Sequence, residues 1–317
     1  MPSPDRRTPS NVSTGRQSDQ DISSFLDTLN NWGRWGNDDE RGTLNLIQAE
    51  HINRAAALAK TGVVISCQRE ITTIHSDENP VPMVHFMTST GESAPTDGQG
   101  IARDWFGMPF HGHAVTHLDS LGHFFLNGLI YNGRPANVVR AEGGAGFGSI
   151  AAASGGVVSR GVLLDIPRLV GREFLAPDHV IDVEQLESAE KLQGVKAGTG
   201  DILVIRTGRD MRKLALGASR YRPGMSVECL PWLHRREISV LVSDESHDAQ
   251  PLPSTAVPTP IHAVGLVAMG LWLVDNAQLE ALAQQCQSAE CWEFMMILAP
   301  LHIEGASGSP INPLAIL

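Results

Sequence analysis

The second half of the chain alternates between apolar runs and helical patterns, and this alternation constrains the fold more than any other feature. The runs have the length and composition of buried strands. They are GVLLDI (161–166), DILVIRT (201–207), SVLVSD (239–244) and CWEFMMILAP (291–300). We predict helices among them at 183–193, 209–215, 261–270 and 276–286. Alternating strands and helices favour an α/β architecture in which helices pack on a sheet.

The first half contains a polar tail and fewer regular elements. Residues 1–20 show no apolar periodicity, so we predict a disordered tail there. Further predicted elements are an amphipathic stretch at 22–32, a helix at 47–60, strands at 63–68 and 81–87, and a loop at 88–108. A length of 317 residues suits one large α/β domain or two tightly fused lobes. We assign residues 21–317 to a single domain.

Charge and cysteine content exclude several classes of protein. The 24 basic and 35 acidic residues give a net charge of 24 − 35 = −11, and no basic cluster could follow a phosphate backbone, so we expect no nucleic-acid partner. The four cysteines include no C-x-x-C pair, which leaves a thiolate zinc site unsupported. The chain shows neither a secretory signal nor an apolar run that could span a bilayer. We therefore expect a cytoplasmic protein without membrane contact.

A dense cluster of metal-binding side chains occupies residues 113–123. Its members are His113, His117, Asp119 and His123, in a chain that has 12 histidines in all. A helix would place His113 and His117 on one face, whereas an extended strand would align His117, Asp119 and His123. Glycines at both ends leave a strand followed by a turn equally open. Isolated histidines are usually structural, but this concentration favours a metal site.

The ligand types in this cluster indicate hydrolytic chemistry. Neutral imidazole and carboxylate ligands suit zinc, manganese or non-haem iron. Two histidines and one aspartate leave coordination positions open for water, whose pKa a metal lowers while it polarises a substrate carbonyl. A further histidine outside the ligand set could carry a proton to the leaving group. No G-x-S-x-G nucleophile motif and no phosphate-binding loop compete with this interpretation.

The motif HAVTHLDSLGH resembles the His-x-Gly-Thr-His-x-Asp-x-Pro-x-His signature of the metal-dependent cyclase family, which includes kynurenine formamidase and isatin hydrolase. Other segments are similar to its longer members. They are RWGNDDERGTLNLI, GRPANVV, GDILVIRTG and SGSPINPLAIL, so that the resemblance covers approximately residues 30–317. It implies a swivelling β/β/α domain with a mixed sheet, an N-terminal arm and helices packed on the sheet. It also implies a homodimer or homotetramer.

The resemblance assigns roles within the motif. It implies that His113, His117 and Asp119 hold one divalent metal, zinc or manganese, and that His123 is the catalytic acid–base residue. Val115 and Leu121 stand where the signature has Gly and Pro. These departures change loop shape more than metal chemistry, and they make the short formamidase subgroup a poorer match.

The same resemblance raises the question of a second metal. Dinuclear members add a downstream His and a Glu, and these positions hold His262 and Asp275 here. Because the aspartate is one methylene shorter, we favour a single metal with His262 as a pocket residue. The alternative for His262 is a structural residue at a helix start after Pro260.

Several other residues are weaker candidates. We predict substrate-binding or pocket roles for Trp32, Trp35, His85 and His111, each of which could equally be structural. His111 could instead support a metal ligand by a hydrogen bond. A dense acidic segment contains Asp244, Glu245, His247 and Asp248. For that segment we favour a solvated loop over a second metal site.

These observations predict a metal-dependent hydrolase with a small-molecule substrate. We expect it to open a small cyclic amide or lactone, or to cleave an aryl formamide, by attack of metal-bound hydroxide on the carbonyl. Three alternatives stay open: a lactonase of the dienelactone type, a metal-dependent lyase or dehydratase, and a metal-binding or ligand-binding protein without catalysis. An intact His123 beside the ligand set argues against the last.

Overall fold

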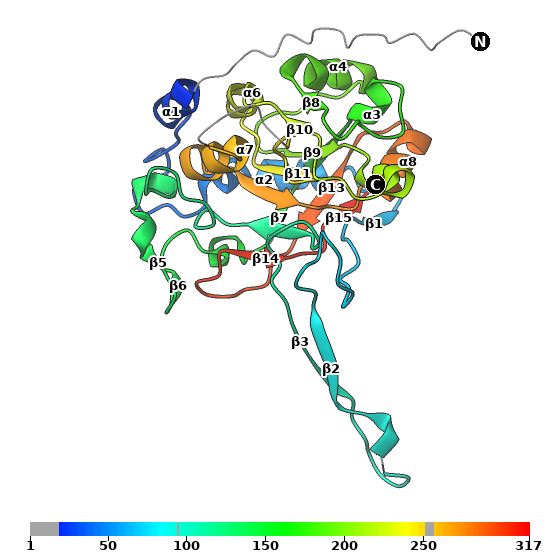
Figure 1. Ribbon diagram of the computed structural model, residues 1–317. Helices are drawn as coiled ribbons and strands as arrows, with labels where there is room; N and C mark the ends of the chain where they lie inside the picture. Colours follow the sequence, from blue (N-terminus) through cyan, green and yellow to red (C-terminus); the bar gives the residue numbers. More distant parts are fainter. Residues whose placement is uncertain (1–18, 94, 251–256) are drawn as a thin grey trace, which may run out of the picture.

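The computed structural model describes residues 19–93, 95–250 and 257–317. Residues 1–18 of the predicted tail lie outside the described residues. The last two residues of that predicted tail, Asp19 and Gln20, belong to the first helix. No helix among the described residues has the length and apolarity that crossing a membrane requires. Within these limits the chain forms a mixed α/β structure around one large sheet (Figure 1).

Eight α-helices occur in the described residues. They are α1 (Asp19–Thr28), α2 (Ala49–Ala56), α3 (Ile166–Leu169), α4 (Val183–Gln193), α5 (Arg209–Leu216), α6 (Cys229–Arg236), α7 (Pro260–Val264) and α8 (Glu280–Ala289). Shorter helical turns are η1 (Gly42–Leu46), η2 (Gly91–Ser93), η3 (Tyr131–Gly133), η4 (Ala136–Val138), η5 (Ile150–Ala153) and a π-helical turn, η6 (Gly265–Met269).

Nine strands form the main sheet in the order β1-β15-β13-β7-β9-β11-β12-β4-β14. They are β1 (Val64–Ser66), β4 (His117–Asp119), β7 (Val157–Asp165), β9 (Ile202–Arg206), β11 (Val240–Ser243), β12 (Trp272–Asp275), β13 (Glu293–Leu298), β14 (Gly308–Pro310) and β15 (Leu314–Ile316). Three small two-stranded sheets pair β2 (Val84–Ser89) with β3 (Arg103–Gly107), β5 (Val139–Arg140) with β6 (Gly144–Ala145), and β8 (Val180–Ile181) with β10 (Gly224–Met225).

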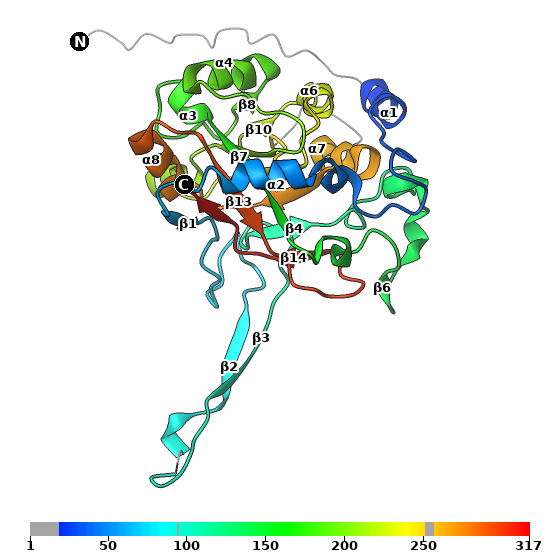
Figure 2. The ribbon, with the colours of Figure 1, turned by 180° about the vertical axis from the view of Figure 1, so that it is seen from behind.

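The centre of the sheet is parallel and its flanks are antiparallel. Strands β7, β9, β11 and β12 run parallel to one another, and β13 and β4 join them antiparallel on either side. Every residue of β9, β11 and β12 is buried, as expected for strands covered on both faces. Helix α2 packs against β7 and β13, while α3 and α4 pack against each other (Figure 2). The mixed sheet with packed helices confirms the predicted fold class.

A long hairpin departs from this body. Strands β2 and β3 pair antiparallel and project well away from the sheet in both ribbon views (Figures 1 and 2). The prediction of a loop at 88–108 was therefore wrong at β3. Phe86 stacks on Trp105 across the hairpin, with ring centroids 5.3 Å apart, and both side chains are about half exposed. The two ends of the hairpin return to the segments around Asn79 and Pro109, next to the motif histidines.

Candidate metal centre

The metal-binding motif begins on β4, a short strand held between β12 and β14. Register pairs join His117 to Asp275 and Asp119 to Leu273 on one side, and Asp119 to Gly308 on the other. Alternation along the strand turns His117 and Asp119 to one face and Leu118 to the core. Of the three arrangements that the spacing allowed, the structure therefore has the strand followed by a turn. Asp275 joins the site because it ends the neighbouring strand.

Asp119 lies at the centre of the site and is 1% exposed. Its Oδ1 atom lies 3.0 Å from His111 Nδ1, 3.4 Å from His117 Nε2 and 3.7 Å from His123 Nε2. Its Oδ2 atom lies 3.8 Å from His262 Nε2. Neither oxygen takes part in a hydrogen bond of proper geometry with the described residues. A buried carboxylate in that state is costly unless a cation balances it.

Two groups of possible ligands share Asp119. One comprises His111, His117 and Asp119, and the other comprises Asp119, His262 and Asp275. Within each group the candidate donor atoms lie within 4.8 Å of one another. In the second group, His262 Nε2 is 3.4 Å from Asp275 Oδ2. The donor set of imidazole nitrogens and carboxylate oxygens suits a divalent ion such as zinc or manganese.

His113, the first histidine of the predicted ligand set, lies in the wall of the same pocket. Its donor atoms belong to neither close group, and its buried Nδ1 makes no hydrogen bond to the described residues. Its backbone oxygen accepts a hydrogen bond of 2.6 Å from Arg209 Nη2. The structure thus brings His117 and Asp119 together and places His111 closer to them than His113.

His123 and His111 form a stacked pair beside Asp119. A turn after β4, in which His123 N–H donates to Ser120 O at 3.0 Å, directs the chain back toward the site. The two imidazole rings are nearly parallel, at 5°, with centroids 3.8 Å apart. Gly308 makes this packing possible, because a Cβ atom there would lie 2.8 Å from the His111 ring. His123 is therefore held in a fixed orientation against the carboxylate.

A pocket of about 250 Å³ opens onto these groups. Its lining consists of Gly112, His113, His117, Asp119, His123, Phe124, Arg222, Ser246, Gln250, Thr259, His262 and Asp275. The volume suits a small-molecule ligand. All four predicted motif residues and the downstream His262 and Asp275 contribute to one cavity.

Three of the predicted pocket residues lie elsewhere in this chain. Trp32 Nε1 donates to Val267 O at 2.7 Å and its ring packs against Gly133, which anchors the N-terminal segment to the body. Trp35 lies under the Arg34 guanidinium, 4.7 Å from the ring centroid. His85 sits on the projecting hairpin, 3.1 Å from Asp104. The structure brings none of these three side chains into the pocket.

Burial and neighbouring charges act in opposite directions on the histidines. Burial lowers the pKa of His123 to about 4, because the Asp119 charge does not overcome desolvation and repulsion from His111 and His262. Burial, with Arg222 and Arg209 nearby, also lowers the pKa of His113 to about 4. For His117, the Asp119 carboxylate outweighs burial and raises the pKa to about 9. At neutral pH the imidazoles of His113 and His123 are therefore neutral, whereas that of His117 is positively charged.

The acidic segment after β11 supports the site from behind. Asp248 Oδ2 lies 2.6 Å from His262 Nδ1, and His247 Nε2 lies 3.2 Å from Asp275 Oδ1. Asp244 accepts the backbone N–H groups at the start of α5. The solvated-loop interpretation was wrong, since these residues are at most 2% exposed. Their position directly after a buried parallel strand was the available signal, because ligand sites form at that end of parallel strands.

Comparisons with known proteins agree with this geometry. The model of the Cyclase family, described as "Putative cyclase", matches residues 65–247. A crystal structure of a novel cyclase is 31% identical, with a TM-score of 0.83 over 92% of this chain and 99% of that chain. A search of curated protein sequences finds no match.

Two isatin hydrolase structures share the fold at lower identity. One, bound to the product analogue thioisatinate, is 19% identical with a TM-score of 0.58 over 86% of this chain and 99% of that chain. Isatin hydrolase A from Labrenzia aggregata, bound to benzyl benzoate, is 17% identical with a TM-score of 0.59 over 83% of this chain and 97% of that chain. The family match over more than half of the sequence, together with the 31% identical relative, shows that this chain belongs to the Cyclase family.

Proposed function

We propose that this chain is a metal-dependent hydrolase that adds water to the carbonyl of a small cyclic amide, lactone or aryl formamide. The observation that carries the proposal is the buried Asp119 carboxylate. Four imidazoles lie within 3.8 Å of its oxygens, yet no described residue forms a hydrogen bond of proper geometry with them. The fold shared with isatin hydrolases supports ring opening at a carbonyl.

We propose that His117 and Asp119 hold one divalent ion, zinc or manganese, with a third ligand from His113 as the family motif implies. His111 is the competing third ligand, because its Nδ1 atom already belongs to the close group. The ion, when bound, polarises a carbonyl and brings the pKa of water toward neutrality. The orphaned carboxylate oxygens and the mixed nitrogen and oxygen donors support this fit.

One ion, not two, is our proposal because His262 provides positive charge at the second group. Burial alone would lower its pKa, but Asp275 and Asp248 outweigh burial and raise the pKa well above the usual value. The resulting imidazolium lies between two carboxylates, 3.4 Å from Asp275 and 2.6 Å from Asp248. Because the charge of His262 already balances these carboxylates, binding of a second cation there would be less favourable.

His123 is the proposed proton carrier. Because its pKa is lowered to about 4, the ring is neutral at pH 7 and can accept a proton from the attacking water. The stack on His111 fixes its orientation. Water adds to the carbonyl carbon, the carbon–nitrogen or carbon–oxygen bond breaks, and His123 returns the proton to the departing atom. The products are a carboxylic acid and an amine or an alcohol, which stay joined if the substrate was a ring.

We further propose a cytoplasmic homodimer or homotetramer. The hairpin supports the assembly, because an isolated two-stranded hairpin is at best marginally stable in water and this one exposes Val84, Phe86, Met87, Trp105 and Phe106. Sedimentation of the Phe86→Ser, Trp105→Ser double variant should show smaller particles than the wild type. Four free cysteines, three of them buried, support a reducing compartment.

An activity panel tests the proposed reaction. Protein loaded with zinc or manganese is assayed on isatin, N-formylkynurenine and unsaturated lactones. We expect turnover of at least one compound that chelation abolishes and metal restores. Full activity and full metal content in both His113→Ala and His117→Ala would contradict the ligand assignment. Absence of turnover across all three compound classes would contradict the proposed reaction.

A further inference from the structure

Arg222 stands apart from the other charged side chains around the pocket. It lines the same cavity as Asp119 and His123, and its side chain is 16% exposed. Its closest ionic contact is Glu245, with Nε 3.8 Å from Oε2, and its guanidinium forms no hydrogen bond to the part of the chain that the structure describes. A guanidinium has five donors, so this one has nearly its full capacity left for a ligand.

The carboxylate nearest to Arg222 is already committed to other cations. Glu245 is fully buried and forms a short ion pair with Arg212. Its Oε2 atom also lies 3.8 Å from Arg209 Nε. Three guanidinium groups therefore share one carboxylate. Burial, with repulsion from Arg209 and Arg212, lowers the pKa of Arg222. An anion brought into the pocket would relieve this imbalance.

Arg209, by contrast, already uses both of its terminal nitrogens within the protein. Its Nη1 atom donates to Asn276 Oδ1 at 2.6 Å and its Nη2 atom donates to His113 O at 2.6 Å. It also lies 3.3 Å from Glu78. Of these three guanidinium groups, Arg222 is the one that lines the cavity with Asp119 and His123.

The backbone holds Arg222 rigidly against the site. Its N–H donates to Gln250 O at 2.9 Å, and Gln250 N–H donates back to Arg222 O at 2.8 Å. Two residues on, Gly224 packs so closely against the backbone of 247–249 that no Cβ atom fits. The same loop carries Asp248, which touches His262. The backbone of Arg222 is therefore tied to the loop that carries Asp248.

We propose that Arg222 recognises a carboxylate on the substrate, at a position away from the reacting carbonyl. This inference rests on the proposed function and narrows it. The substrate class becomes a cyclic amide, lactone or aryl formamide that carries a carboxylate group. A planar guanidinium binds carboxylates through paired, charge-assisted hydrogen bonds, which gives it both affinity and orientation. Phe124, on the pocket lining, supplies an apolar surface for the body of such a molecule.

Matched substrate pairs test the inference in the metal-loaded enzyme. One pair is N-formylanthranilate and formanilide, and another is carboxyphthalide and phthalide. We expect kcat/KM to be at least about tenfold higher for the carboxylate member, because hydrogen bonds to charged groups change equilibria by roughly ten- to a hundredfold. In Arg222→Gln the ratio of kcat/KM values should fall to about one, because KM rises for the carboxylate member. Arg222→Lys should retain part of the preference for that member. Equal kcat/KM within each pair, or a ratio that Arg222→Gln leaves unchanged, would overturn the inference.

A matched control and a binding measurement separate this inference from the proposed function. Arg220 lies two residues before Arg222, and its exposed guanidinium lies over the Tyr221 ring. Arg220→Gln should preserve the ratio of kcat/KM values within each substrate pair. Calorimetry with isophthalate and benzoate requires no turnover. The dicarboxylate should bind at least about tenfold more tightly, and Arg222→Gln should remove the difference. If neither substrate pair is hydrolysed, the proposed reaction fails for these classes, and the calorimetry alone supports or overturns the anion site.

Discussion

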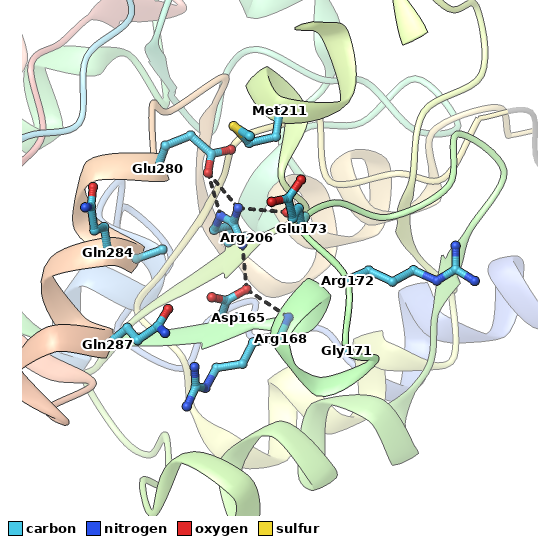
Figure 3. A pocket seen from close by; sticks show the side chains of 11 residues that line it. Asp165, Arg168, Gly171, Arg172, Glu173, Arg206, Met211, Glu280, Gln284 and Gln287 are labelled. Carbon is cyan, nitrogen blue, oxygen red and sulfur yellow. Dashed lines mark hydrogen bonds and ion pairs between the residues drawn. The ribbon is translucent and has the colours of Figure 1, made fainter. Parts of the chain in front are cut away.

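Two of the cavities that contain buried charged side chains differ in how those charges are balanced. The larger, about 520 Å³, lies where β7 and β9 end and is centred on Arg206 (Figure 3). Arg206 donates to Asp165 at 2.8 Å, to Glu280 at 2.6 Å and to Glu173 O at 2.9 Å. The smaller, about 250 Å³, contains Asp119, whose oxygens accept no hydrogen bond from the described residues.

Missing hydrogen bonds, and not cavity size, are therefore our reason for proposing the smaller cavity as the functional site. In the larger cavity each central charge already has a partner within the protein. A ligand would therefore have to break the ion pairs that Arg206 forms with Asp165 and Glu280. In the smaller cavity the protein has gathered carboxylates and imidazoles without completing their interactions. A cation can complete them at little structural cost.

The largest expected effect comes from removing the central charge of each cavity in turn. Asp119→Asn should lower kcat/KM by about a thousandfold or more, because metal assistance contributes several kcal/mol to the transition state. Asp165→Asn should instead lower the free energy of unfolding by roughly 3 kcal/mol, the effect of breaking a buried ion pair, and leave kcat unchanged. Steady-state kinetics measures kcat and kcat/KM, and urea unfolding measures the free energy of unfolding. Equal effects of both variants on kcat would refute the contrast.

The next largest effect concerns the proton carrier. His123→Gln should lower kcat by about a hundred- to ten-thousandfold, the usual contribution of general acid–base catalysis, while metal content stays as in the wild type. His302→Gln is a matched control, because His302 is exposed and paired only with Glu304 among the described residues. Kinetics and metal analysis on both variants check this. An active His123→Gln enzyme would remove the residue from the mechanism.

A smaller effect is expected from the residue behind His262. Asp248→Asn should lower kcat/KM by about ten- to a hundredfold, because Asp248 holds His262, a pocket residue and not a proposed ligand, in its orientation beside Asp119. Asp248→Glu tests whether the negative charge or the length of the side chain matters. Competition with a chelator should give the metal affinity of the wild type. Unaltered kcat/KM in Asp248→Asn would make the contact with His262 merely structural.

The smallest effect, about tenfold for each pH unit, is a pH dependence of metal affinity that distinguishes the histidines within the site. The pKa of His117, which Asp119 raises against the effect of burial, is about 9, so the metal-free protein holds a proton on a proposed ligand at pH 7. A ligand imidazole must be neutral, so binding expels that proton. Affinity should therefore rise about tenfold per pH unit up to about pH 9 and then level off.

His113 and His123 make no such contribution, because their pKa values of about 4 leave them neutral throughout this range. Titration of metal-free protein with zinc or manganese, repeated at several pH values, measures the slope. Affinity that is constant from pH 6 to pH 9 would contradict the account of His117.

Local signals in the sequence predicted the elements that are stabilised locally. Helix α4 matches the predicted 183–193 because Asp182 and Gln185 form a capping box at its start and Gly194, at a φ of 67°, ends it. Strands β9 and β11 were predicted from continuous apolar runs. The motif also identified His117, Asp119 and His123 as neighbours, because they are separated by few residues along the chain.

Elements that depend on distant partners either remained undecided, as β4 did, or were missed, as β12 was. Strands β4 and β12 have three and four residues, too few for a periodic signal, and they exist because each pairs with the other and with a further strand. The approach of His111 to Asp119 requires Gly308, which lies far along the chain. The burial of Asp248 requires His262 as a partner. Spacing along a sequence contains no direct information on such long-range pairs.

The metal content of purified protein, after dialysis against zinc or manganese and removal of free ions, tests the central claim most directly. We predict about one ion per chain in the wild type, none in Asp119→Asn, and one in the control Asp165→Asn, since the incomplete interactions of Asp119 are what the ion completes. Wild-type protein that retains no metal, or Asp119→Asn protein that retains as much as the wild type, would contradict the account.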